Sequence, residues 1–466
     1  MKYDFDKPVN GQGTHCVKWD EPTPIPSHGE ESQDTICDSN ATTETNQVPL
    51  PLGGDRGGLI PLWVADMDFE AAPAIREALK KRVEHGVFGY SIVQDSYYDA
   101  VISWYARRHQ WHVEREWIQY TTGVVPAISA VIKALTMPGE RVLIMTPVYN
   151  CFFSSVRNNG CEVVCSPLVA KSSDTPSLLT YEVDWEDFER KCADEKCTVF
   201  LLCNPHNPAG RVWTREELQR MNDICLRHHV RVVSDEIHCE LVMPGHEFVP
   251  FGRLTPTPNP SRGEGSLDTL SHQGIATEAN QAPLPSGGAG GGCQGGGSYP
   301  VICCSPSKSF NTAGLQMANI ICADQESRRR INRAININEI CDVNPFAPLA
   351  VEAAYNESED WIDELNQYLW GNYQALLQFF AEQLPQLKVF KLEGTYLVWV
   401  DITATGLSAD EIEEKLLREA RVWVNSGTMY GTDGYIRINI ATQRARLMEG
   451  LRRMAATLAP LTPLAP

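Results

Sequence analysis

The chain has 466 residues, of which 43% are hydrophobic and 21% are charged, and its formal net charge is −19. This length allows two domains and at least one large core, and the composition is that of a globular protein. The negative charge argues against nucleic acid or an anionic membrane surface as the main partner, because both require a basic face.

The start of the chain and its cysteines favour a cytoplasmic protein. Met1 to Asn10 is polar and lacks an apolar run of signal-peptide length, and no apolar run is long enough to span a membrane. The 15 cysteines are scattered, form no CxxC pair and have no histidines at zinc-ligand spacing. We therefore expect reduced thiols, no metal site and no membrane partner.

Two stretches are poor in large apolar residues, from about Glu21 to Gly58 and from about Arg253 to Ser298. Both are rich in Pro, Gly, Ser and Thr, so they cannot bury enough surface to offset the entropy of ordering. Asp34 to Gly58 aligns without gaps with Asp268 to Gly292, which indicates one element inserted twice. We expect two surface loops, with a linear docking motif as the alternative.

Between residue 71 and about residue 330, expected helices alternate with expected strands. Apolar residues at helical spacing predict helices over 71–85, 97–110, 124–136 and 214–229. Short continuous apolar runs predict buried strands over 141–146, 161–166, 198–203, 230–234 and 301–304. This alternation indicates an α/β fold in which helices cover both faces of a mostly parallel sheet.

The pattern changes in the last third of the chain. Expected helices over 345–355 and 359–384 precede expected strands over 395–402 and 435–440, with a helix over 409–421 between them. We therefore expect an N-terminal arm (1–70), a large domain (71–330) and a smaller α+β C-terminal domain (331–466). A ligand site is expected at the carboxyl ends of the parallel strands, facing the smaller domain.

Functional side chains follow four of the expected strands. Tyr149 lies in PVYN after the first, Asn207 in NPHNPAG, Asp235 and His238 in DEIH, and Lys308 in SPSKSFN. Each alone has a structural explanation, because Asn-Pro is typical of turns, Asp often caps helices and a single lysine is usually solvated. An aromatic ring, an amide, a carboxylate and an amine at neighbouring strand ends instead indicate one site.

The blocks NPHNPAGRVW, SDEIH and SPSKSFNTAGL, in this order, resemble fold-type-I pyridoxal-5'-phosphate (PLP) enzymes of the class I/II aminotransferase family. The segments WVADMDF, HGVFGYS, TTGVVPAI, TPVYN, VVSDEIH and YIRINIA look closest to the MalY/PatB group of cystathionine β-lyases, which are carbon–sulfur lyases. The resemblance covers nearly the whole chain outside the two insertions. It implies a PLP-transferase-like large domain and PLP as the cofactor.

The resemblance implies a role for each strand-end residue. Lys308 matches the lysine that holds PLP as a Schiff base and, once released, removes the substrate Cα proton. Asp235 matches the carboxylate that keeps the pyridine nitrogen protonated. Asn207 matches the residue that hydrogen-bonds the ring oxygen, and Tyr149 the aromatic residue that stacks on the ring. His238 stands where many aminotransferases have a tyrosine and is expected to support the cofactor.

The cofactor phosphate needs a local positive site in this acidic chain. Backbone N–H groups at a helix start and two serine hydroxyls are expected to supply it, from Gly123, Val124, Val125, Ser305 and Ser307. Many aminotransferases have an arginine eight residues after the lysine to clamp the phosphate, but this chain has Gln316 at that position. Tyr90 resembles the tyrosine that reaches the phosphate of the neighbouring subunit, which implies a homodimer.

The substrate is expected to be a small amino acid bound by the C-terminal domain. Arg437 matches the arginine that pairs with the substrate α-carboxylate in bidentate fashion; the alternative is a surface arginine on an alternating strand. Trp63 and Asp66 are expected to line the entrance to the site.

The favoured reaction is α,β-elimination of L-cystathionine or a related cysteine S-conjugate to pyruvate, ammonia and a thiol. The main alternative is transamination between an L-amino acid and a 2-oxo acid, which begins with the same proton abstraction. A catalytically idle binding protein is a third reading, but Lys308 and Asp235 are both present.

Overall fold

A computed structural model describes residues 1–20, 58–175, 177–254, 299–337 and 342–461. The insertions expected at about 21–58 and 253–298 lie, apart from their end residues, outside the described part of the chain. Within the described ranges, no helix combines the length and apolarity needed to cross a membrane.

The larger of the two main sheets has seven strands in the order β2–β10–β9–β8–β7–β3–β4. Strands β9, β8, β7, β3 and β4 pair in parallel, whereas β10 is antiparallel to both β9 and β2. The strands span Ile118–Thr121 (β2), Arg141–Thr146 (β3), Glu162–Pro167 (β4), Cys197–Cys203 (β7), Arg231–Asp235 (β8), Val301–Cys304 (β9) and Ala318–Cys322 (β10). The mostly parallel sheet expected from the apolar runs is confirmed.

Helices cover both faces of this sheet because alternate strand residues point to opposite sides. In β3, Val142 and Ile144 join one apolar cluster, whereas Leu143 and Met145 join another. The first cluster includes residues of α4 (Val124–Leu135), α5 (Cys151–Asn158) and α8 (Gln325–Asn336). The second includes residues of α2 (Pro73–His85), α3 (Asp95–His109), α6 (Trp185–Cys192), α7 (Arg215–Arg227) and α9 (Ala347–Glu357). The carboxyl ends of the parallel strands stay between these layers.

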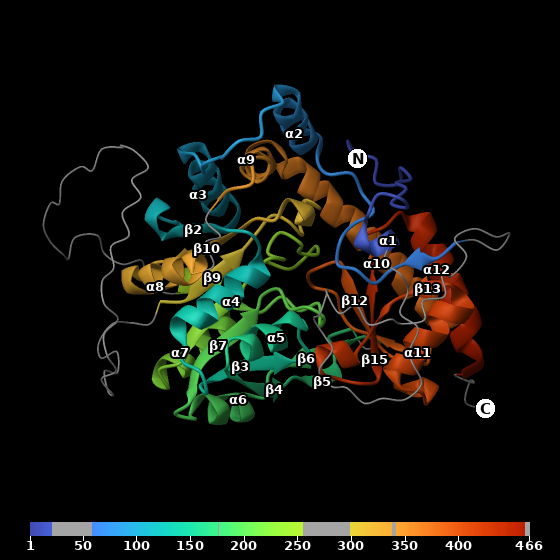
Figure 1. The fold of residues 1–466 in the computed structure, drawn as a ribbon. Coiled ribbons are helices and arrows are strands. Elements are labelled where there is room, and N and C mark those ends of the chain that lie inside the picture. Colours follow the sequence, from blue (N-terminus) through green and yellow to red (C-terminus); the bar gives the residue numbers. More distant parts are fainter. Residues whose placement is uncertain (21–57, 176, 255–298, 338–341, 462–466) are drawn as a thin grey trace, which may run out of the picture.

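The C-terminal part of the chain forms a four-stranded sheet in the order β11–β12–β15–β14, antiparallel throughout. Its strands span Lys388–Val389 (β11), Leu397–Asp401 (β12), Asn425–Ser426 (β14) and Tyr435–Asn439 (β15). The accompanying helices are α10 (Glu359–Gln383), α11 (Ala409–Lys415) and α12 (Arg444–Leu458). Figure 1 shows these orange and red elements beside the green and yellow strands of the larger sheet.

The N-terminal segment lies against the C-terminal part. Strand β1 (Ile60–Pro61) pairs in parallel with β13 (Val422–Trp423), and the short helix α1 (Val17–Asp20) lies near α12 in Figure 1. The remaining strands, β5 (Val169–Ser172) and β6 (Leu179–Glu182), form a hairpin. The chain that follows β1 therefore reaches the strand ends of the larger sheet from the side of the smaller one.

Candidate active site

Four neighbouring strands deliver the predicted strand-end residues to one edge of the larger sheet. Asp235 ends β8, Asn207 lies in the turn after β7, and Lys308 follows β9. Tyr149 follows β3, which is the next strand beyond β7. Because these strands run in parallel, their carboxyl ends share one edge. The charge of Asp235 acts on both Lys308 and Tyr149, so the three residues lie near one another at this edge.

Arg437 reaches the same space from β15 of the smaller sheet. Its side chain is 3% exposed, and its Nη1 donates to Asn207 Oδ1 at 3.2 Å. Its Nη2 donates to the Trp63 carbonyl at 2.7 Å, and the guanidinium lies 5.0 Å from the Tyr430 ring centroid. Its Nε is buried and has no hydrogen-bond partner among the described residues. The alternative of a surface arginine therefore does not hold.

Lys308 is oriented by the segment that follows β1. Its Nζ donates to the Ala65 carbonyl at 2.6 Å, and the Tyr396 hydroxyl donates to the same oxygen at 2.9 Å. Burial lowers the pKa of Lys308; the charge of Asp66 opposes this shift and that of Arg437 adds to it. The amine of Lys308 is therefore neutral more often than the amine of a solvent-exposed lysine.

Burial shifts the pKa values of Asp235 and His238 in opposite directions. Burial raises the pKa of Asp235 to about 7, although the Ile237 N–H and the charge of Lys308 oppose the shift. Burial, with the charges of Lys308 and Arg437, lowers the pKa of His238 to about 3, so its ring is neutral. The His238 Nδ1 is buried and lacks a hydrogen-bond partner in the described part of the chain. Burial also raises the pKa of Tyr149, so its hydroxyl stays protonated.

The expected phosphate residues fall into two groups. Gly123 is the N-cap of α4, and no side chain caps that end, so the first N–H groups of Val124 and Val125 are not used by a cap. By contrast, Ser305 Oγ donates to the Met317 carbonyl at 2.7 Å and accepts from the Ser307 backbone N–H at 3.1 Å. The Ser305 hydroxyl is thus engaged in the fold, and its contact with a phosphate stays a prediction.

The Trp63 carbonyl contacts Arg437, and the place of Trp63 and Asp66 at the entrance stays a prediction. The structure adds a residue that the sequence did not indicate. Trp63 stacks on Trp423 at 4.0 Å between ring centroids, and its Nε1 donates to the Lys18 carbonyl at 3.2 Å. The Lys18 ammonium, 1% exposed, lies 3.4 Å from Asp66 and 3.1 Å from Asp68. Burial raises the pKa of Asp66, and Lys18 opposes the shift. A lone lysine before a long insertion carries no periodic signal, so the sequence could not reveal this contact.

Tyr90 lies on the surface of the described chain. Its side chain is 96% exposed, and its neighbours Val87, Phe88 and Ile92 are between 53% and 76% exposed. Within one chain, Tyr90 therefore projects outward from an apolar segment.

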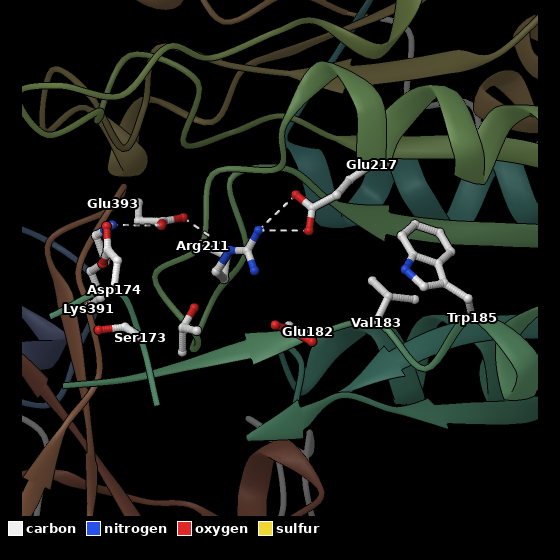
Figure 2. A pocket seen from close by; sticks show the side chains of 10 residues that line it. Ser173, Asp174, Glu182, Val183, Trp185, Arg211, Glu217, Lys391 and Glu393 are labelled. Carbon is white, nitrogen blue, oxygen red and sulfur yellow. Dashed lines mark hydrogen bonds and ion pairs between the residues drawn. The ribbon is translucent and has the colours of Figure 1, made fainter. Parts of the chain in front are cut away.

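An ion-pair network ties the turn that carries Asn207 to the smaller sheet (Figure 2). Arg211, 7% exposed, donates through Nε to Glu393 Oε2 at 3.0 Å and through Nη2 to both oxygens of Glu217 at 2.7 and 2.9 Å. The backbone N–H of Glu393 in turn donates to the Gly210 carbonyl at 2.8 Å. These bonds link the turn that carries Asn207 to the segment that precedes β12.

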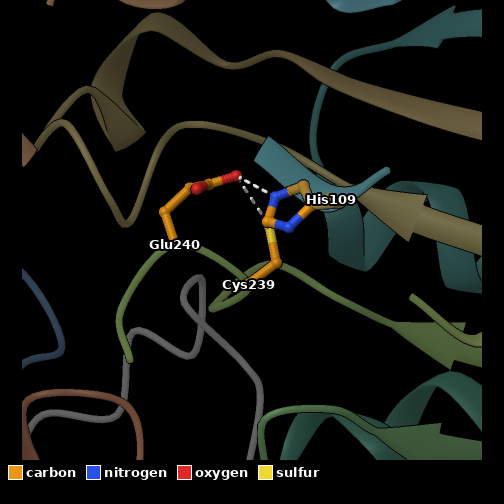
Figure 3. Close-up of side chains that lie close together, drawn as sticks. All are labelled: His109, Cys239 and Glu240. Atoms are coloured by element: carbon orange, nitrogen blue, oxygen red, sulfur yellow. Dashed lines mark hydrogen bonds and ion pairs between the residues drawn. The ribbon is translucent and has the colours of Figure 1, made fainter. Parts of the chain in front are cut away.

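A second buried cluster joins His109 with Cys239 and Glu240, the two residues that follow His238 in the chain (Figure 3). Glu240 Oε1 lies 2.6 Å from His109 Nε2 and accepts from Trp104 Nε1 at 2.6 Å, while Arg108 Nε lies 3.7 Å from Oε2. An adjacent arginine and two hydrogen-bonding groups compensate this carboxylate, which is the arrangement of a structural ion pair. The expectation of no metal stays a prediction.

Known proteins match nearly the whole length of the chain. A family model described as aminotransferase class I and II matches residues 58–454. The chain is 36% identical over 456 residues to cystathionine beta-lyase PatB of Bacillus subtilis (strain 168), covering 97% of this chain and 99% of that protein. It is 28% identical over 453 residues to protein MalY of Escherichia coli (strain K12), covering 96% and 97% of the two chains.

Two solved structures have the same fold. A PLP-bound putative aminotransferase from Clostridium difficile 630 superposes with a TM-score of 0.78 at 34% identity, covering 98% of this chain and all of that chain. Cystalysin from Treponema denticola, which contains a pyridoxal 5'-phosphate cofactor, superposes with a TM-score of 0.77 at 28% identity, covering 99% of this chain and 100% of that chain.

Proposed function

The chain belongs to the aminotransferase class I and II family, and on this basis we propose that it is a PLP-dependent carbon–sulfur β-lyase. Its substrate is L-cystathionine or a related cysteine S-conjugate. The observation that carries the proposal is the convergence of Lys308, Asp235, Asn207 and Arg437 on one space between the two sheets. The similarity over nearly the full length to a cystathionine β-lyase supports elimination as the reaction.

The residues present fit PLP. A buried carboxylate whose pKa is raised to about 7 lacks a full countercharge, and a protonated ring nitrogen beside Asp235 would supply it. The uncapped start of α4 at Val124 offers N–H groups and a positive helix end to the phosphate. When bound, PLP supplies an aldehyde that holds the substrate amino group and a ring that withdraws electrons from Cα.

Four residues hold the cofactor in place in this proposal. Asp235 pairs with the ring nitrogen, Asn207 donates through its amide to the ring oxygen, and Tyr149 stacks on the ring. His238 is neutral and keeps an unused Nδ1, so it can hydrogen-bond near the cofactor without adding positive charge. The hydroxyls of Ser305 and Ser307 are further candidates for the phosphate.

Lys308 takes the substrate Cα proton at Nζ. A primary amine accepts a proton only when neutral, and burial beside Arg437 lowers the pKa of Lys308 in that direction. In the chain without a substrate, Nζ donates to the Ala65 carbonyl at 2.6 Å, and the amine leaves this carbonyl when it acts on the substrate. The same residue therefore anchors the cofactor before the reaction and moves a proton during it.

Arg437 orients the substrate by its α-carboxylate. A guanidinium has five N–H donors, and Asn207 Oδ1 and the Trp63 carbonyl each take one of them. The Nε–H and one N–H on each Nη atom are thus left for a carboxylate, which is enough for a bidentate pair. In this proposal, Trp63 and Asp66 line the entrance to the site.

The net reaction combines the S-conjugate with one water molecule. The Cβ–S bond breaks, sulfur leaves with its electron pair and gains a proton, and the three-carbon part becomes pyruvate and ammonium. No oxidant or reductant is required. Transamination is the runner-up, because the family model and several members carry the aminotransferase name and the proton abstraction is shared.

A homodimer is part of the proposal. Tyr90 is 96% exposed within an apolar segment, which is unfavourable in water unless another surface covers it. In a dimer, Tyr90 would contact the phosphate held by the second copy. We also propose a cytoplasmic location and the division into an arm (1–70), a large domain (71–330) and a smaller domain (331–466).

The proposal is tested by the fate of the substrate in the presence and absence of an acceptor. PLP-loaded protein is given L-cystathionine, and pyruvate, thiol and new amino acid are measured with and without a 2-oxo acid. We expect pyruvate and thiol in equal amounts and no dependence on the 2-oxo acid. Amino transfer that requires the 2-oxo acid, without thiol release, would assign the transamination reaction instead.

A further inference from the structure

Asp66 lies between two lysines that belong to distant parts of the chain. On one side, its Oδ1 is 3.4 Å from the buried Lys18 ammonium. On the other, the carbonyl of the preceding residue, Ala65, accepts from Lys308 Nζ at 2.6 Å, and the charge of Asp66 acts on Lys308. The side chain is 26% exposed, yet Oδ1 is buried, so the exposed part of the carboxylate is not the oxygen that faces Lys18. Asp66 therefore borders the space around Lys308.

The charge of Asp66 is less compensated than that of its neighbour Asp68. Asp68 is 2% exposed and is contacted by Lys18 at 3.1 Å, by Arg446 at 3.2 Å and by Trp19 Nε1 at 3.0 Å. Asp66 shares the same Lys18 at the longer distance of 3.4 Å. Its Oδ1 has no hydrogen-bond partner among the residues described. A partly buried carboxylate in this state is stabilised by any further cation that reaches it.

The Lys308 side chain shows that a primary amine fits against the backbone next to Asp66. Its Nζ donates to the Ala65 carbonyl at 2.6 Å, next to the Asp66 carboxylate in the chain. When Lys308 is engaged elsewhere in the site, this carbonyl and the Asp66 carboxylate remain as two acceptors. A carbonyl and a carboxylate suit the three N–H donors of an alkylammonium.

We propose that Asp66, with the Ala65 carbonyl, binds the ammonium group at the far end of the substrate and selects cysteine S-conjugates whose leaving thiol carries an amine. This inference rests on the proposed function and assigns the substrate class of the same site. The α-carboxylate occupies Arg437, so a second charged group must find a different partner. Lys18 is a positioning residue, because it is buried and acts on the substrate only through Asp66.

The N-terminal segment is part of this arrangement. The Lys18 carbonyl accepts from Trp63 Nε1 at 3.2 Å, and Trp63 stacks on Trp423 at 4.0 Å. Asn439 Nδ2 donates to the Asp66 carbonyl at 2.7 Å, which fixes the backbone at the recognition residue. Selectivity for the amine thus depends on contacts between α1, the segment after β1 and the smaller sheet.

The test compares three S-conjugates that differ at one terminal group. S-(2-aminoethyl)-L-cysteine, S-propyl-L-cysteine and S-(2-carboxyethyl)-L-cysteine carry an ammonium, a methyl and a carboxylate group at their far ends. Thiol release by the PLP-loaded wild type gives kcat/KM for each. We expect the aminoethyl compound to exceed the propyl compound by about tenfold or more, as expected for a hydrogen bond between charged groups, and the carboxyethyl compound to be the poorest.

Variants then assign the selectivity to Asp66. In Asp66→Asn the aminoethyl-to-propyl ratio should fall toward one, and in Asp66→Glu, which keeps the charge, part of the ratio should remain. Asp401→Asn is the matched control, because Asp401 lies at the end of β12 and its Oδ1 serves Thr403 at 2.6 and 2.9 Å. That variant should keep the wild-type ratio.

The outcomes separate the inference from the function on which it rests. Equal kcat/KM for the aminoethyl and propyl compounds in the wild type would overturn the inference while leaving the lyase standing. An unchanged ratio in Asp66→Asn would overturn the assignment to Asp66. If none of the three compounds released a thiol, the proposed lyase would fail and the inference with it. The comparison of the three compounds uses the wild type alone, so it tests the inference even if Asp66→Asn folds poorly.

Discussion

Replacing Arg437 with lysine removes the planar fork from the substrate site while keeping the charge. In the wild type, Asn207 and the Trp63 carbonyl use two of the five guanidinium N–H groups and leave three for the α-carboxylate. A lysine has three N–H groups in total, so it cannot serve both protein acceptors and a bidentate carboxylate. At least one charge-assisted hydrogen bond to the substrate is lost.

The size of the effect follows from burial. Arg437 is 3% exposed, so solvent screens its contacts little. A hydrogen bond to a charged group contributes about 1.5–3 kcal/mol, and every 1.4 kcal/mol is about a factor of ten. We therefore expect kcat/KM for L-cystathionine to fall roughly 10- to 150-fold in Arg437→Lys.

The assay is thiol release against substrate concentration, together with the inhibition constant of L-alanine, which has the same carboxylate but no leaving group. Both KM and the inhibition constant should rise. Arg444→Lys is the matched control, because Arg444 donates to Asn372 Oδ1 at 3.0 Å and lies 5.3 Å from the Tyr368 ring, outside the site. Loss of this bond is expected to lower kcat/KM by at least about tenfold. A change of less than about twofold in Arg437→Lys would therefore refute the assigned role.

Three further changes test the contacts around the site. Lys18→Met leaves the buried Asp68 and the partly buried Asp66 with less countercharge and should lower the free energy of unfolding by about 3 kcal/mol, measured by denaturant titration; no loss would contradict the ion pairs of Lys18. Glu393→Gln weakens the link to Arg211 and should lower the free energy of unfolding by roughly 1–3 kcal/mol. An unchanged midpoint of denaturant unfolding would show that Glu217 alone holds Arg211. Glu236 is buried, which raises its pKa from 4.5 to about 8. Between these values the carboxyl is protonated in the folded state and ionised in the unfolded state, so Glu236 lowers wild-type stability as pH rises, by roughly 1.4 kcal/mol per pH unit, in addition to the effect of Asp235. Glu236→Gln should make the slope in cofactor-free protein shallower by that amount, and parallel curves for the two proteins would disprove the assignment.

The larger sheet could be predicted from the sequence because its strands are buried on both faces. The expected strands over 141–146 and 301–304 coincide with β3 and β9 as observed. The hairpin β5–β6 was not predicted, since all four residues of β5 are exposed and carry no apolar signal. The helix expected over 409–421 ends at Lys415 and continues as a π-helix over Leu416–Ala420, whose apolar residues keep a nearly helical period.

The site could be predicted where it follows the strands and not where it depends on distant segments. Asp235 and Lys308 stand at the ends of β8 and β9, where parallel strands place side chains together whatever the rest of the fold. Lys18 contacts Asp66 across 48 residues that include the first insertion, and a single charged pair at such a separation leaves no pattern in one sequence. Tertiary packing alone brings the two together.

The central claim is that Lys308 and the cofactor it holds carry out elimination. The most direct test measures pyruvate and thiol from L-cystathionine, without any 2-oxo acid, for the PLP-supplied wild type and for Lys308→Ala, with thermal unfolding of both proteins as a folding control. The account predicts equal amounts of pyruvate and thiol from the wild type and neither product from the folded variant. Thiol release that continues in Lys308→Ala, or a wild type that releases none, would contradict it.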